Sequence, residues 1–190
     1  MVRYAVQTDN ATTAKSRGAY LRVHFKNTSE TANAIKGMSL QKALNYYADV
    51  KAKKRCIPFR RFDGSTGRTG QALEFGVTHG RWPVKSVEFV TTLLKNAEAN
   101  AVAKGLEADK LFVKHIQVNQ APKTSRRSFR AHGRIAPFKC SPSHVEVVLG
   151  VNTEAVPKGV ETEDAPVERA TTATAMTLSR RKAAKLRTAH

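Results

Sequence analysis

The residues with the clearest chemical potential lie in one arginine-rich run, residues 123–137, which has the sequence KTSRRSFRAHGRIAP. An arginine guanidinium is a rigid fork of hydrogen-bond donors that matches a phosphate group and can also stack on a base. Phe129 adds an aromatic face for base stacking, and Gly133 allows the backbone to turn or to approach a partner closely. Residues 110–144 hold eight Lys or Arg and no Asp or Glu. This composition predicts a polyanionic partner, because bound phosphates relieve the repulsion among the cations and release counterions.

The same run contains one histidine, His132, whose ring could act as a catalytic acid or base. Such a group needs a neighbour that orients it or tunes its pKa. No carboxylate lies within 13 residues of His132 and the nearest histidine is His144, so RNA contact is the favoured role. Cys56 and Cys140 show no metal-ligand spacing, and the glycine-rich residues 64–70 lack the phosphate-loop motif. We predict no catalytic residue, metal, cofactor or small-molecule substrate, and hence no enzyme.

The chain as a whole is strongly basic. Its 190 residues include 33 Lys and Arg against 15 Asp and Glu, which gives a net charge of +18. The positive charge gathers in separate blocks, a distribution that favours nucleic acid as the partner. No apolar stretch approaches the roughly 20 residues that cross a bilayer, and the first residues show no signal-peptide core. We therefore expect a cytoplasmic protein with no membrane partner.

A small core of helices and strands must hold these basic segments. Alternating apolar residues predict strands at 19–25, 111–118 and 144–149. Helical spacing and capping residues predict a short helix that ends at Lys36, a second helix capped by Ser39, and a third. The third helix has Pro83 in its first turn and ends before Gly105, and its many alanines suit close packing.

Four segments lie outside this regular pattern. Residues 1–18 are expected to form a basic N-terminal arm, and residues 151–190 a C-terminal extension with an acidic linker and then a basic tail. Residues 56–82 lack periodicity, and a structureless loop of about 25 residues in a small domain is normally functional or ordered by a partner. Residues 119–143 connect two predicted strands, so we expect a hairpin whose arms reach roughly 35 Å beyond the sheet.

The arginine-rich run also resembles a known family. Residues 126–135 and 141–146 strongly resemble the large-subunit ribosomal proteins of universal family twenty-two, called protein seventeen in the eukaryotic large subunit. Further matching segments extend the resemblance over residues 14–150; they are residues 40–48, 80–83, 93–101 and 118–123. The insert at residues 54–82 is similar to the eukaryotic and archaeal branch of the family.

The resemblance implies an α+β fold within residues 19–150, with three helices packed on a three-stranded antiparallel sheet. It adds an insert loop at 54–82 and a long protruding β-hairpin at 120–141. It further implies a structural role in the large (60S) ribosomal subunit, where the domain binds large-subunit ribosomal RNA and contacts neighbouring ribosomal proteins. The hairpin would line the polypeptide exit tunnel and face the nascent polypeptide, supporting subunit assembly and translation. Such a protein works in the cytoplasm and passes through the nucleolus during assembly.

Two sets of residues carry this expectation. The hairpin tip that would line the tunnel consists of Arg127, Ser128, Phe129, Arg130, Ala131, His132 and Gly133. Contacts with ribosomal RNA are expected from the basic side chains of Lys15, Arg17, Arg22, Lys53, Lys54, Arg55, Arg60, Arg61, Arg68, Arg81, Lys123, Arg126, Arg127, Arg130, Arg134 and Lys139. The residues alone leave two other interpretations open: a DNA-binding or chromatin protein, and an RNA-processing enzyme that uses His132 or His24.

Overall fold

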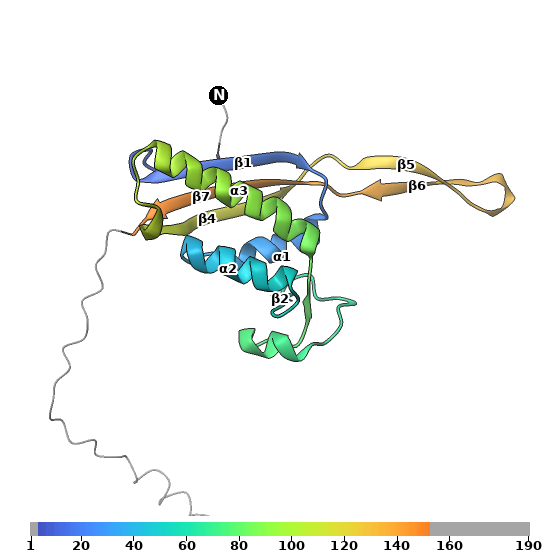
Figure 1. Ribbon diagram of the computed structural model, residues 1–190. Helices are drawn as coiled ribbons and strands as arrows, with labels where there is room; N and C mark the ends of the chain where they lie inside the picture. The colour runs from blue at the N-terminus through green and yellow to red at the C-terminus, as the bar shows by residue number, and fades with distance from the viewer. Residues whose placement is uncertain (1–3, 153–190) are drawn as a thin grey trace, which may run out of the picture. The chain divides into compact units, whose positions relative to one another are not determined.

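The computed structural model of the chain describes residues 4–152 (Figure 1). The predicted C-terminal extension at 151–190 therefore lies outside the described residues, apart from Val151 and Asn152. Within the described part, a first strand is followed by two α-helices, by an insert with two short strands and a 3-10 helix, by a third α-helix and then by four strands. The protein thus combines helices and antiparallel strands, as the sequence predicts.

A three-stranded antiparallel sheet forms the centre of the fold, in the order β1–β7–β4. Its strands are β1 (Thr13–Leu21), β4 (Leu111–Gln120) and β7 (Ser143–Val151). The middle strand β7 pairs with β1 on one side and with β4 on the other. Val147, for example, is paired with Ser16 of β1 and with Ile116 of β4. Because β7 is covered on both edges and packs into the core, residues 145–150 are all buried.

Three α-helices pack against this sheet: α1 (Phe25–Ile35), α2 (Leu40–Lys51) and α3 (Val84–Ala103). α3 packs against β1 and β7, whereas α1 packs against β4. Their apolar stripes and alternate sheet residues share one core, and a single 3-10 turn, η2 (Ala108–Lys110), leads into β4. None of the described helices is long and apolar enough to cross a membrane. The predicted α+β fold class, with helices on a three-stranded antiparallel sheet, is confirmed, but the helix count is four rather than three once the 3-10 helix η1 (Gly70–Phe75) is included.

The first strand begins earlier than predicted. Residues 13–18, which we expected to belong to the basic arm, pair one after another with β7. The pairing shifts register between Gly18 and Leu21, where Tyr20 has a positive φ of 54°, and the strand ends at Leu21, which pairs with Ser143. The predicted strand at 19–25 is therefore wrong in position, and Phe25 instead begins α1.

The insert at residues 54–82 is ordered, contrary to the structureless loop that we predicted. Its ends form two short paired strands, β2 (Ile57–Pro58) and β3 (Gly80–Arg81). Between them lies a 3-10 helix, η1 (Gly70–Phe75), which adds a fourth helical segment to the three α-helices. Phe59 donates its backbone N–H to a carbonyl next to β3 and buries its ring in the core. The insert is thus anchored by backbone pairing and by scattered apolar side chains, which show no periodicity in the sequence.

The strands β4 and β7 continue into a second antiparallel pair, β5 (Thr124–Phe129) and β6 (Ile135–Cys140). Figure 1 shows this hairpin extending past the end of the three-stranded sheet. Its tip is the 3-10 turn η3 (Ala131–Gly133), and the N–H of Arg130 donates to the carbonyl of Arg134 at 2.8 Å. The long protruding hairpin that we predicted is therefore present, as a direct continuation of the central sheet.

Candidate nucleic-acid interface

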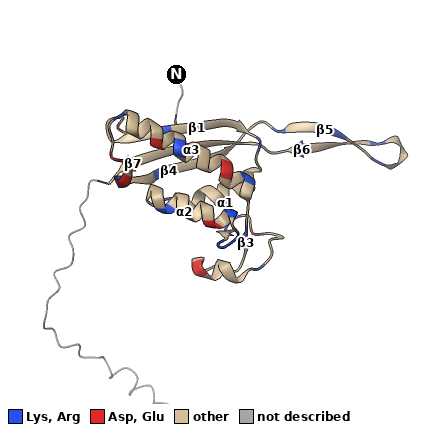
Figure 2. Cartoon of the chain, viewed as in Figure 1, with Lys and Arg blue, Asp and Glu red and all other residues tan. Residues whose placement is uncertain are grey.

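The hairpin presents its cations to solvent. All of its basic residues are exposed, and their side chains make no hydrogen bond or ion pair with another described residue; they are Lys123, Arg126, Arg127, Arg130, Arg134 and Lys139. Figure 2 shows Lys and Arg along the hairpin and no Asp or Glu. A ribbon of uncompensated cations attracts a polyanion, because binding removes their mutual repulsion.

Apolar side chains are interleaved with these cations. The exposed fractions of Phe129, Ile135 and Phe138 are 78%, 56% and 61%. Phe129 lies opposite Ile135 across the hairpin, whereas Phe138 lies opposite Arg126 on the other face. Cations that bind phosphate and flat apolar groups that stack on bases are the two components of single-stranded RNA recognition. The hairpin therefore offers both components on both of its faces.

The tip of the hairpin holds His132 in a left-handed backbone conformation, with φ 59° and ψ 35°. Gly133 follows it with φ 66°, a conformation that glycine adopts without strain. His132 is exposed, and no described carboxylate contacts it. Residues 4–152 contain no group of three or more His, Cys, Asp or Glu that could hold a metal ion. RNA contact stays the prediction for His132, since the tip lacks a partner group for acid–base chemistry.

Several predicted RNA-binding cations of the insert instead contact the protein itself. Arg55 forms an ion pair with Glu74, and its guanidinium lies 4.7 Å from the centre of the Tyr46 ring. The hydrogen bond with Glu74 raises the pKa of Arg55. Arg81 donates to a backbone carbonyl of the insert at 2.7 Å, and Arg60 donates to another at 3.2 Å. These three side chains stabilise the folded insert through contacts within the protein, so their guanidinium groups are only partly available to a ligand.

The insert is also held by a carboxylate that the sequence analysis did not single out. Glu30, in α1, is 2% exposed and accepts hydrogen bonds from three consecutive backbone N–H groups. The donors are Arg60, Arg61 and Phe62, at 3.3, 3.0 and 2.9 Å. Three N–H groups that converge on one anion resemble a phosphate site, but here a side chain of the protein fills it. No local pattern in the sequence connects residues thirty positions apart.

Two of the three predicted binding cations in and just after the first strand also contact the protein itself. The Nε of Arg17 lies 3.6 Å from a carboxylate oxygen of the buried Glu146. Lys15 donates to the carbonyl of Thr8 at 3.3 Å and to the side-chain oxygen of Asn10 at 3.1 Å. The contacts of Lys15 attach the N-terminal segment to the sheet, and the contact of Arg17 joins β1 to β7. Arg22, just beyond the strand, is exposed and makes no such contact within residues 4–152.

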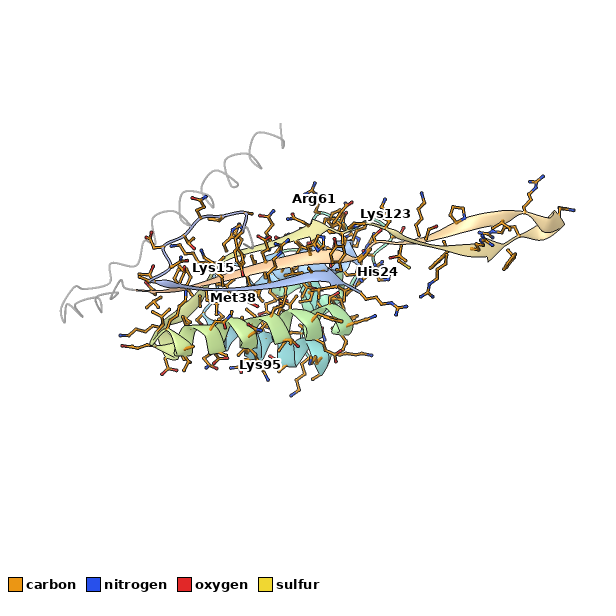
Figure 3. All side chains as sticks on the ribbon, turned by 90° about the horizontal axis from the view of Figure 1, so that it is seen from above. Lys15, His24, Met38, Arg61, Lys95 and Lys123 are labelled. Carbon is orange, nitrogen blue, oxygen red and sulfur yellow. The ribbon has the colours of Figure 1, made fainter. Side chains whose placement is uncertain are left out.

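The structure therefore separates the predicted binding residues into two groups. Those engaged with the fold are Lys15, Arg17, Arg55, Arg60 and Arg81. The others are exposed, and their side chains make no hydrogen bond or ion pair with the described part of the chain: Arg22, Lys53, Lys54, Arg61, Arg68 and the six cations of the hairpin. At the base of the hairpin, Lys123 and His24 line one pocket (Figure 3). The free cations thus lie on the hairpin, at its base and on the insert.

Comparison with known proteins places this geometry in context. Residues 16–150 match the model of the family described as ribosomal protein L22p/L17e. The large ribosomal subunit protein uL22A of Saccharomyces cerevisiae is 59% identical over 162 residues, which cover 85% of this chain and 88% of the relative. The uL22A protein of Schizosaccharomyces pombe is 58% identical over 163 residues, with 85% and 87% covered. The uL22 protein of Argas monolakensis is 56% identical over 170 residues, with 89% and 92% covered.

Proposed function

Because this chain belongs to the L22p/L17e family of ribosomal proteins, we propose that it binds large-subunit ribosomal RNA as a structural constituent of the large ribosomal subunit. The observation that carries the proposal is the hairpin, whose exposed cations have no countercharge among the described residues. Ribosomal RNA supplies that countercharge along a continuous phosphate backbone. Neighbouring ribosomal proteins are the second class of partner.

The hairpin has a further role in this proposal: its tip lines the exit tunnel and faces the nascent polypeptide. The tip residues 127–133 carry exposed arginines beside Phe129, a surface on which RNA can pack from one side while a passing peptide meets the other. The role is architectural and involves no catalysis. The protein assembles into the subunit in the nucleolus and serves translation in the cytoplasm.

The test is replacement of the hairpin cations by acids. In cells that depend on this chain, the variant Arg127→Glu/Arg130→Glu/Arg134→Glu should lower the yield of large subunits, because it sets negative charge against phosphate. Subunits are separated on sucrose gradients, and a tagged chain is followed before and after a high-salt wash. The intact chain should migrate with the large subunit and resist the wash.

A matched control places three acids elsewhere. Lys36, Lys42 and Lys95 are exposed and have no ion pair in the described structure, and Lys95 lies on the helical side (Figure 3). Their triple replacement by Glu gives the same change in net charge and should leave more subunits intact than the hairpin variant. Normal subunit yield and normal translation in the hairpin variant would defeat the assignment of the hairpin to RNA.

A further inference from the structure

A pocket lies where the hairpin joins the body of the protein, and we call it the shoulder pocket. Residues from the segment after β1, from the first turn of α3 and from both arms of the hairpin line it, among them Tyr20, Arg22, Lys85, Pro122, Arg126 and Cys140. Its volume is about 430 Å³. That volume falls within the roughly 300–1,000 Å³ of pockets that hold small organic ligands.

Backbone contacts fix the walls of the shoulder pocket. The N–H of Tyr20 donates to Nδ1 of His144 at 3.0 Å, and the two rings meet edge to face at 4.7 Å. The N–H of Phe25 donates to the carbonyl of Ser141 at 3.2 Å, which ties the start of α1 to the returning arm of the hairpin. The positive φ of Tyr20 turns its side chain away from the sheet pattern of β1. The pocket is therefore built by tertiary contacts between segments that are far apart in the sequence.

The chemistry of the lining combines positive charge with flat apolar surface. The side chains of Arg22, Lys85 and Arg126 have no hydrogen bond or ion pair with another described residue, and no acid lines the pocket. Val23, two prolines and the ring of Tyr20 supply the apolar part. Thr124 and Cys140 form a pair in the hairpin register, so Arg126, two positions along, points to the same face. Phosphate suits the cations, and the face of a base suits the apolar surface.

We propose that the shoulder pocket holds one unpaired nucleotide of an RNA strand, with its phosphate among the three cations and its base against Tyr20 and the prolines. This proposal rests on the RNA binding proposed above and specifies what the RNA must supply there. A base in a duplex is stacked on both faces and hydrogen-bonded along its pairing edge, so it cannot enter the pocket, whereas a base in a loop or bulge is free to do so.

Cys140 provides a native reporter of occupancy. It lines the pocket and is partly exposed, whereas Cys56, the other cysteine of the chain, is fully buried. The full-length chain is treated with N-ethylmaleimide, and the labelling rate of each cysteine is measured by mass spectrometry of its peptide. Three probes are added in turn: oligouridine, a blunt RNA duplex of equal length, and polyglutamate. Fluorescence anisotropy measures the binding of each probe directly.

With oligouridine at about ten times its Kd, the labelling rate of Cys140 should fall about tenfold, because only the unoccupied chain reacts. The duplex and polyglutamate should bind through other cations and leave the rate of Cys140 nearly unchanged. Tyr20→Ala should weaken oligouridine binding at least about fivefold, the lower end for loss of one stacked base. Val102→Ala is the control, since Val102 is 60% exposed against 67% for Tyr20 and lies on α3, away from the pocket.

Equal protection of Cys140 by duplex RNA or polyglutamate, at equal occupancy, would overturn the nucleotide assignment. So would bound oligouridine that leaves the labelling rate unchanged, or equal affinity in the Tyr20→Ala and Val102→Ala chains. If anisotropy shows that the chain binds no RNA at all, the proposed function fails and this proposal fails with it. Binding without protection refutes the shoulder pocket alone, so the two failures are distinct.

Discussion

The buried carboxylate of Glu30 gives a sharp test of how the basic insert is held. Three consecutive backbone N–H groups, those of Arg60, Arg61 and Phe62, donate to it at 3.3, 3.0 and 2.9 Å. The side chain lies in α1 and is only 2% exposed, so solvent has almost no access to the carboxylate in the folded protein. We expect Glu30→Ala to release this part of the insert from α1 and to destabilise the fold.

The size of the effect follows from the donors. A hydrogen bond to a charged group contributes about 1.5–3 kcal/mol. Arg60 and Arg61 are exposed residues, so water can replace the carboxylate once the segment opens. We therefore expect Glu30→Ala to lower the free energy of unfolding by about 3 kcal/mol, which corresponds to one or two such bonds. Glu30→Gln should cost about 1.5 kcal/mol, because one oxygen keeps two donors while the new amide NH₂ faces the N–H of Arg60.

Urea unfolding of the full-length chain, followed by circular dichroism, measures this change. With a slope of about 1–3 kcal/mol/M, a loss of 3 kcal/mol moves the midpoint by about 1–3 M. Limited trypsin digestion reports the insert directly, since release should speed cleavage after Arg60 and Arg61. Glu98→Gln is the control, because the Glu98 side chain makes no hydrogen bond or ion pair within the described residues. An unchanged midpoint and unchanged cleavage in Glu30→Ala would refute the reasoning.

Two further substitutions test the core. Burial raises the pKa of Tyr47 well above its ordinary value near 10, so its contribution to stability is complete below pH 10 and is lost at higher pH. Tyr47→Phe should cost about 1 kcal/mol at pH 7 but lose less stability than the natural chain between pH 9 and 11, as urea midpoints across that range would show. Gly80→Ala should cost about 1–3 kcal/mol, because its Cβ would lie 2.7 Å from Sγ of Cys56 and 3.0 Å from a Thr69 methyl carbon. Gly64→Ala, with nothing within 4 Å, is the control, and equal midpoints for the two alanine variants would show that the contact at Gly80 relaxes without cost.

The sequence predicts the helices best, because their signals are local. Ser39 precedes a run of apolar residues at helical spacing, and α2 spans Leu40–Lys51. Pro83 directly precedes α3, and Gly105 follows it with a φ of 75°, as a glycine that ends a helix commonly does. Both boundaries depend on residues within a few positions of each other.

The first strand escaped prediction because of what packs against it. In β1 the side chains that face the core are small, as at Ala14 and Ser16, since α3 lies close to this strand. The alternate positions carry Lys15 and Arg17 on the other face. A strand that buries alanine, serine and glycine shows no alternation of large apolar and polar residues, so its pattern resembles that of a basic arm.

The sequence indicates only part of the candidate interface, and the part that it does not indicate has one cause. The hairpin arginines are recognisable because acid is absent from a long continuous stretch of sequence. The ion pair of Arg55 with Glu74 and that of Arg17 with Glu146 join residues that are distant in the sequence. Which cation has an intramolecular partner is decided by tertiary packing, and composition cannot reveal it.

Tertiary packing also determines where the exposed positive charge of the hairpin lies. β4 and β7 are fixed by the core, so packing sets the direction in which the hairpin leaves the body. Beyond Pro122 and Pro142, backbone pairing continues, but Phe129 and Phe138 stay exposed. A two-stranded ribbon on its own is marginally stable in water, and the repulsion of its arginines weakens it further. RNA that neutralises the arginines and covers the aromatic rings would stabilise the ribbon with the same contacts that bind it. On the proposed function, RNA binding would also stabilise the hairpin, and a substitution that weakens one should weaken the other.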